Sequence, residues 1–134
     1  MRNKLLLTGT ALLVGFGIFA GVYFYYLPSQ MVNRYLTDFN SYSDNRTLYP
    51  NEISRFLSFH QVHSLPSPSV KLKIKDSAFN SREVLANFEI ITYAGKKQVA
   101  DVYYGMLAFS MVRDQLDWRI ESVKVVREMG KAGR

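Results

Sequence analysis

The sequence predicts an α+β protein in which one transmembrane helix precedes two further helices packed on a curved, four-stranded antiparallel sheet. Three observations lead to this prediction. The chain opens with a long uncharged run, continues with two segments of helical periodicity, and ends with four segments rich in β-branched and aromatic residues. Its 134 residues suffice for one small domain, which excludes a multidomain enzyme. The absence of cysteine excludes disulfides, thiolate catalysis and zinc ribbons.

The uncharged run covers residues 5–27 and predicts the membrane span. A helix of this length is about 34 Å long, enough to cross a hydrocarbon core of about 30 Å. Arg2 and Lys4 precede the run, and the next charge is Arg34. By the positive-inside rule, the N-terminus is therefore expected in the cytoplasm and the C-terminal domain on the periplasmic, extracytoplasmic side.

A cleaved signal peptide is the alternative interpretation of this run. Its apolar region would be about 7–15 residues long and would end at small residues around the cleavage site. The nearest candidate is Ala20, but bulky Ile18 lies two positions before it and the apolar run continues to Leu27. An uncleaved single-pass anchor is therefore the preferred interpretation.

Small residues inside the span form a second pattern. Gly17 and Gly21 have the G-x-x-x-G spacing, and Ala11 and Gly15 continue the small-residue spacing. Such a face lets two helices approach closely, so it predicts packing of the anchor in a homo-oligomer or against another subunit. Glycine is common in membrane helices, and chance explains the pattern at least as well.

An amphipathic helix is predicted directly after Pro28, with Ser29 as its N-cap. Tyr35 and Phe39 belong to an apolar stripe with helical spacing in this segment. The stripe either covers the domain's own sheet, which we favour, or docks on a membrane or a partner. In the second interpretation, Tyr35 and Phe39 are candidate partner contacts.

A polar loop and a short helix from Asn51 to about Phe59 are expected next. The loop contains the triplet 45–47, beginning with Asn45, which matches an N-glycosylation acceptor and matters only in a eukaryotic secretory pathway. His60 and His63 have H-x-x-H spacing, but a metal site needs three or four ligands and no cysteine or third histidine completes one. We interpret the pair as structural and predict no metal and no cofactor.

The rest of the chain has strand character. The predicted strands are Val70–Lys75, Arg82–Tyr93, Gln98–Arg113 and Asp117–Arg127. Short turns make them an antiparallel meander with the helices on one face. A change of phase near Glu121 and Ser122 predicts a β-bulge, and Gly105 predicts a bend that curves the sheet.

The last six residues have no periodicity and are expected to fray. The predicted organisation is a cytoplasmic end (1–4), a transmembrane helix (5–27), an exported domain (28–128) and a flexible tail (129–134).

The order of two helices and a bent sheet that closes with the segment 118–123, Trp-Arg-Ile-Glu-Ser-Val, resembles the nuclear transport factor 2-like, or cystatin-like, fold. With one span ahead of it, the chain resembles the bitopic inner-membrane assembly factors of bacterial type IV secretion and conjugation machines. It is also similar to small membrane-anchored assembly proteins of respiratory complexes. Both resemblances imply a non-enzymatic subunit that binds other subunits of a membrane complex.

Basic residues predict a contact surface. Lysine and arginine number 17 against 11 acidic residues, a net charge of +6. Lys71, Lys73 and Lys75 form a stripe along one strand, and Lys96 and Lys97 add a cluster at a turn. The stripe either meets anionic lipid or an acidic partner, or keeps an edge strand from pairing with another sheet. Nucleic acid is not expected, because the domain lies beyond the membrane.

Two other classes of function stay open. A membrane-anchored ligand-binding or sensing domain would need a cavity between helices and sheet. The aromatic residues expected to line it are Phe88, Tyr93, Tyr103 and Trp118. An enzyme would need Glu89 and Asp101, on adjacent predicted strands, as a carboxylate pair in that cavity. Each lies where a solvated face is expected, so no catalytic residue is predicted.

Overall fold

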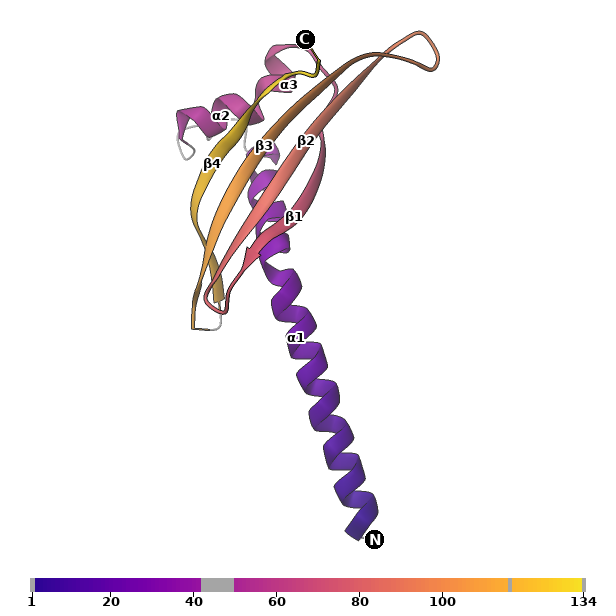
Figure 1. Cartoon of the computed structure of the whole chain (residues 1–134), viewed down its shortest axis with the longest axis vertical. Helices are drawn as coiled ribbons and strands as arrows, with labels where there is room; N and C mark the ends of the chain where they lie inside the picture. Colours follow the sequence, from indigo (N-terminus) through magenta and orange to yellow (C-terminus); the bar gives the residue numbers. More distant parts are fainter. Residues whose placement is uncertain (1, 42–49, 116, 134) are drawn as a thin grey trace.

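The computed structural model of the chain describes residues 2–41, 50–115 and 117–133 (Figure 1). The Asn45 triplet lies outside these residues. Within them the architecture is α+β, with helices first and strands afterwards. The elements are α1 (Arg2–Ser41), α2 (Asn51–Leu57), α3 (Phe59–Val62), β1 (Ser69–Ser77), β2 (Ser81–Ala94), β3 (Gln98–Asp114) and β4 (Asp117–Lys131).

Helix α1 is continuous through Pro28. The sequence had predicted a break there, with one helix before Pro28 and a second helix after it. The predicted N-cap at Ser29 is therefore wrong. Proline has no N–H, so the carbonyl of Phe24, four residues earlier, loses its intrahelical donor. Arg82 of β2 replaces that donor, because its Nη1 lies 3.3 Å from the Phe24 carbonyl oxygen and 2.9 Å from that of Tyr25. The surrounding structure thus supports a helix that the sequence alone would interrupt.

The N-terminal part of α1 extends away from the sheet (Figure 1) and is long and apolar enough to cross a membrane. Gly17 and Gly21 are exposed on it, and a Cβ atom added to either would meet nothing within 4 Å. Ala11 and Gly15 have the same spacing of four residues but lie on a different face of the helix. Gly15 and Gly17 are two residues apart, which is a rotation of about 200° around a helix, so the two pairs lie on opposite sides.

The C-terminal part of α1 packs on the sheet. Val32, Leu36 and Phe39 are buried, and the half-buried ring of Tyr35 makes an edge contact with Phe109 at 5.5 Å between centroids. This confirms that the apolar stripe covers the domain's own sheet. Tyr35 and Phe39 are accordingly core contacts and not the partner contacts of the alternative interpretation.

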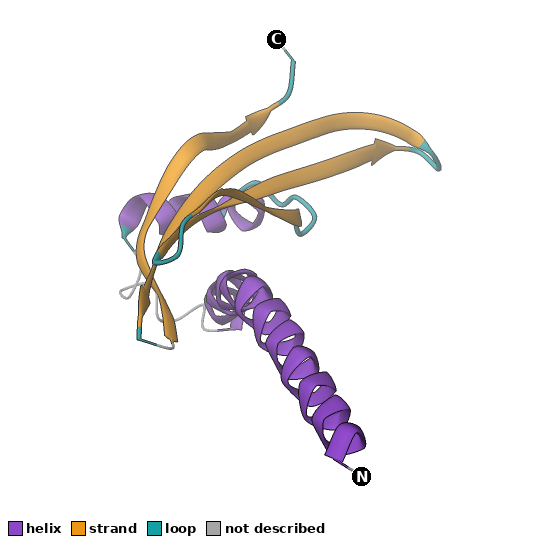
Figure 2. Cartoon of the chain, turned by 60° about the horizontal axis from the view of Figure 1, so that its bottom comes forward, coloured by secondary structure: helices purple, strands orange, loops and turns teal. Residues whose placement is uncertain are grey.

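The sheet is antiparallel with strand order β1-β2-β3-β4, which confirms the predicted meander and makes β1 and β4 its edges. Alternate side chains of β2, at positions 84, 86, 88 and 90, are buried. They face α1 and α2, and the sheet arches over these helices (Figure 2). We call this the inner face. The outer face, on the opposite side, carries no helix in the described part of the chain.

The β-bulge expected near Glu121 and Ser122 is present, and the strand pairing is also disturbed at Gly105, where a bend was expected. Glu121 has no partner between the pairs that Ile120 and Ser122 form with β3, which is a β-bulge. The pairing of β3 with β4 is also irregular at Gly105. A Cβ atom there would lie 2.7 Å from Cε2 of Phe56, so glycine allows the Phe56 ring of α2 to lie directly on the strand.

Strand β4 continues past the predicted boundary at residue 128. Met129 is buried in the core, and Gly130 pairs with Tyr104. Lys131 forms an ion pair with Asp101. The prediction of a flexible tail is therefore wrong for residues 129–131, because one apolar side chain and one charge bind this segment to the sheet.

Candidate functional site at the junction of helix and sheet

One end of the sheet lies beside the middle of α1 (Figure 1). We call this end the tip; it comprises the β1–β2 turn (residues 78–80), the β3–β4 turn and the strand ends that flank them. Two arginines join it to the helix. The first, Arg82, has its guanidinium carbon 5.3 Å from the ring centroid of Tyr25 and 5.0 Å from that of Trp118. The cation is therefore held between one aromatic ring of α1 and one of the sheet. Such contacts contribute about 2 kcal/mol where they are desolvated.

The second arginine, Arg113 of β3, forms a matching arrangement. Its guanidinium carbon lies 5.0 Å from the ring centroid of Phe24 in α1 and 4.8 Å from that of Phe79 in the β1–β2 turn. Its Nε donates to the carbonyl of Gln115 at 3.0 Å, and its backbone N–H donates to the carbonyl of Asn80 at 2.8 Å. One residue thus connects both turns of the tip with the helix.

Neither arginine was predicted from the sequence as a site residue. A signal for Arg82 was present, because it is in phase with Val84 and Ala86, which face the core. A charged residue at an inward position needs a partner, and here the partner is a backbone carbonyl. The carbonyl of Phe24 in turn needs a donor because of Pro28. The inward-facing charge of Arg82 and the carbonyl that Pro28 leaves without a donor therefore satisfy each other.

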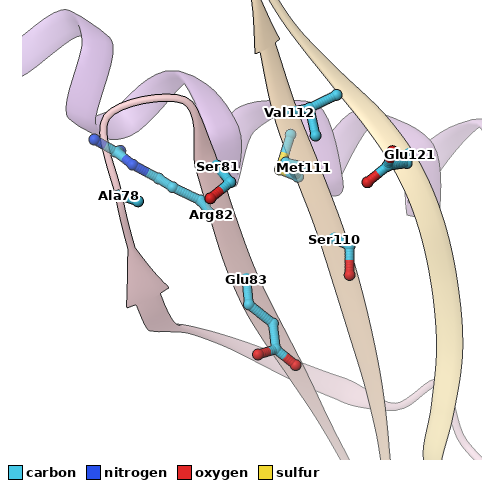
Figure 3. Close-up of a pocket in the computed structure, with 8 residues that line it drawn as sticks. All are labelled: Ala78, Ser81, Arg82, Glu83, Ser110, Met111, Val112 and Glu121. Atoms are coloured by element: carbon cyan, nitrogen blue, oxygen red, sulfur yellow. The ribbon is translucent and has the colours of Figure 1, made fainter.

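A shallow depression of about 420 Å³ lies at the tip (Figure 3). Its lining residues are Ala78, Ser81, Arg82, Glu83, Ser110, Met111, Val112 and Glu121. Figure 3 shows the Arg82 side chain extending away from Ser110 and Glu121. The carboxylate of Glu83 forms an ion pair with Lys75, with 3.3 Å between Oε2 and Nζ. Within the described residues, no group of three or more His, Asp and Glu side chains is placed to hold a metal ion.

The structure does not bring together the four aromatic residues expected to line a cavity. Phe88 is buried against Phe56, with ring centroids 5.0 Å apart, so side chains fill the space between α2 and the sheet here. Tyr103 is half-buried 6.0 Å from the ring of Phe59. Tyr93 is 61% exposed at the far end of β2, and Trp118 belongs to the tip.

The carboxylate pair that an enzyme would need is not formed. Glu89 pairs with Tyr104 and Asp101 pairs with Thr92, which places the two carboxylates on opposite faces of the sheet. The hydrogen bond between the Tyr104 hydroxyl and Glu89 raises the pKa of Tyr104. The hydrogen-bonded ion pair with Asp101 raises the pKa of Lys131. The two carboxylates therefore serve separate surface contacts.

The lysine stripe lies on the edge strand β1, as one interpretation expected. Lys71 and Lys73 are exposed, whereas Lys75 forms the ion pair with Glu83 already described. A groove of about 340 Å³ opens next to Lys71. It is lined by Lys71, Asn87, Phe88, Glu89, Tyr104, Gly105, Met106 and Arg127.

The two histidines have separate surroundings. The ring of His63 stacks on Phe59 at 4.1 Å between centroids, and its Nδ1 lies 2.9 Å from the Phe59 carbonyl oxygen. His60 is half-buried in α3. The contacts of His63 agree with a structural interpretation of this residue.

No protein-family model, curated protein or solved structure matches the chain. Its class is therefore defined by its own architecture. It is an α+β domain built onto the end of one long apolar helix and clamped to that helix by two arginines.

Proposed function

We propose that the protein is a membrane-anchored, non-enzymatic assembly subunit that binds other subunits of a membrane complex through the outer face of its sheet. The junction carries this proposal. Arg82 and Arg113 fasten the sheet to the same helix that would serve as the anchor. A domain held in this way presents the same face to neighbouring membrane proteins in a constant orientation. A subunit that positions other subunits needs such a fixed contact face.

The charges near the N-terminus support the proposed orientation of the chain in the membrane. Arg2 and Lys4 favour a cytoplasmic N-terminus and hence a periplasmic domain. The order of elements, with the sheet arched over the helices, supports a domain of the nuclear transport factor 2-like type. Among the complexes that use such subunits, a type IV secretion or conjugation machine is our first candidate, and a respiratory complex is the second.

The packing of the inner face favours protein binding over ligand binding. Phe56 occupies the place where a cavity beside Phe88 would have to open. The outer face, in contrast, offers the groove beside Lys71, where the cation of Arg127 and the side chains of Tyr104 and Met106 are also present. One carboxylate, Glu89, also lines the groove and is hydrogen-bonded to Tyr104. The two cations leave an excess of positive charge beside it, which suits an acidic segment of a partner protein.

Purification of the tagged, full-length protein from its native membrane in mild detergent tests this proposal. We expect a reproducible complex larger than a dimer by size analysis. The double variant Lys71→Glu/Lys73→Glu should lose most of it, because like charges then face an acidic partner. Lys75 stays unchanged, since it pairs with Glu83.

The matched control is Lys96→Glu/Lys97→Glu, which reverses two exposed lysines at the other end of the sheet. This variant should retain the complex. A wild-type protein that is only a monomer or dimer would contradict the assembly role. Equal losses in both double variants would contradict the assignment of the contact to the β1 side.

A further inference from the structure

The anchor helix determines the height of the tip relative to a membrane. The tip contacts α1 at Phe24 and Tyr25, which lie at the end of the uncharged run. The helical rise from Leu5 to Tyr25 is about 30 Å, which equals the thickness of a hydrocarbon core. If α1 spans the bilayer as proposed above, the tip therefore lies in the headgroup layer of the leaflet from which α1 emerges.

The β1–β2 turn presents an apolar side chain at this level. The side chain of Phe79 is 79% exposed, the highest exposure among the large hydrophobic residues of the described chain. The guanidinium group of Arg113 lies over its ring. Aromatic rings and arginines are both favoured at this depth, where an apolar body can leave water while a cationic group meets lipid phosphate.

The neighbouring turn has a different character. Asp114 and Asp117, on either side of the β3–β4 turn, are both exposed. Carboxylates are repelled by lipid phosphates and are costly to move out of water. Among the described residues at the tip, the exposed Phe79 is therefore suited to enter the bilayer surface.

We propose that the β1–β2 turn is a second membrane contact, in which Phe79 inserts at the boundary between headgroups and acyl chains of a phospholipid bilayer. This inference rests on the proposed anchoring by α1. Together, the helix and the inserted turn would hold the domain at two points and prevent it from tilting on its anchor.

Site-directed spin labelling tests the insertion, and the cysteine-free chain makes single labels unambiguous. The reporter is Asn80→Cys, which leaves Phe79 in place. Tyr93→Cys, an exposed site at the far end of the sheet, is the aqueous control. Phe19→Cys in α1 reports on the anchor itself. Each full-length variant is placed in nanodiscs of phosphatidylcholine and phosphatidylglycerol, and collisions with oxygen and with a water-soluble nickel chelate are compared.

We expect the labels at positions 19 and 80 to favour oxygen and the label at 93 to favour the nickel chelate. Adding Phe79→Ser to Asn80→Cys should shift the label at 80 towards the value at 93. If position 19 is shielded but 80 is as accessible to nickel as 93, or if Phe79→Ser changes nothing, the insertion is overturned while the anchor stands. If position 19 is itself accessible to nickel, the anchor fails and both proposals fall.

Discussion

The two ends of the sheet are made from the same strands but have opposite surroundings. At the tip, Arg82 is bound to α1 and lies over the ring of Trp118, which is buried. At the other end, the β2–β3 hairpin reaches beyond the helices (Figure 1), and Tyr93 and Val99 are exposed. Contact with the helix, and not strand composition, therefore determines which end is held in place.

This difference also separates the roles of the two ends. At the tip, Arg82 donates hydrogen bonds to two carbonyl groups of α1, and these contacts require the helix to stay in place beside the sheet. The hairpin closes at Gly95, whose positive φ of 72° suits a turn. Stability is therefore expected to depend strongly on the tip and little on the hairpin.

The largest expected effect tests this comparison directly. Trp118→Ala should lower the free energy of unfolding by about 3–5 kcal/mol, because it removes a buried ring and one side of the Arg82 contact. Tyr93→Ala should change it by less than about 0.5 kcal/mol, as for other exposed sites. Both are measured by denaturant unfolding in the same detergent. Similar losses at the two positions would show that the ends are not different.

A smaller loss is expected midway between the ends, where Phe56 lies on the strand. Gly105→Ala places a methyl group against that ring and should cost about 1–3 kcal/mol. Gly130→Ala is the matched control, since a Cβ there meets nothing within 4 Å. Thermal unfolding of both variants gives the comparison, and a Gly105→Ala protein as stable as the control would contradict the described packing.

Loss of the hydrogen bond from Arg82 to the Phe24 carbonyl should lower the stability by as much as Gly105→Ala or less. Unlike that loss, it should depend on whether Pro28 is present. Arg82→Met leaves the carbonyl of Phe24 without its donor, which should cost about 1–3 kcal/mol. In a Pro28→Ala background, the new N–H can donate to that carbonyl, so the same Arg82→Met change should cost at least about 0.5 kcal/mol less. A double-mutant cycle measures this coupling. Strict additivity would mean that the arginine does not replace the missing donor.

The smallest effect concerns the last residues of β4. The pKa of Lys131 in the folded protein is raised above its ordinary value of 10.5 by Asp101. The ion pair therefore contributes stability that is complete below pH 10.5 and is lost as the pH rises through the raised folded value. Melting temperatures of the wild type and Lys131→Met should differ slightly at neutral pH and converge at strongly alkaline pH. A difference in melting temperature that grows with rising pH would contradict a stabilising ion pair between Lys131 and Asp101.

Local periodicity was sufficient to predict much of this fold. The alternation of apolar and charged residues predicted strands, the short turns between them predicted the antiparallel meander, and the change of phase in β4 predicted the bulge at Glu121. These features depend on neighbouring residues, so the sequence contains them directly. The same holds for the apolar stripe that contains Leu36 and packs on the sheet.

The features that the sequence did not predict depend on residues far apart in the chain. Arg82 is 58 positions from Phe24, so its donor role cannot be read from either local pattern. The continuous course of α1 through Pro28 depends on that contact. Met129 has no periodic neighbours, and its burial follows from its position beside Gly105. The candidate site was missed for the same reason.

The central claim is that α1 and the sheet form one unit, joined at the tip. The most direct test is a distance measurement by double electron–electron resonance in nanodiscs. One nitroxide is placed at Phe19→Cys on the exposed part of α1 and the other at Lys124→Cys, an exposed position of β4. The structure predicts a single narrow distance distribution that broadens when Arg82→Met is added. A broad distribution in the otherwise unmodified protein would show that the sheet moves freely relative to α1 and would contradict the claim.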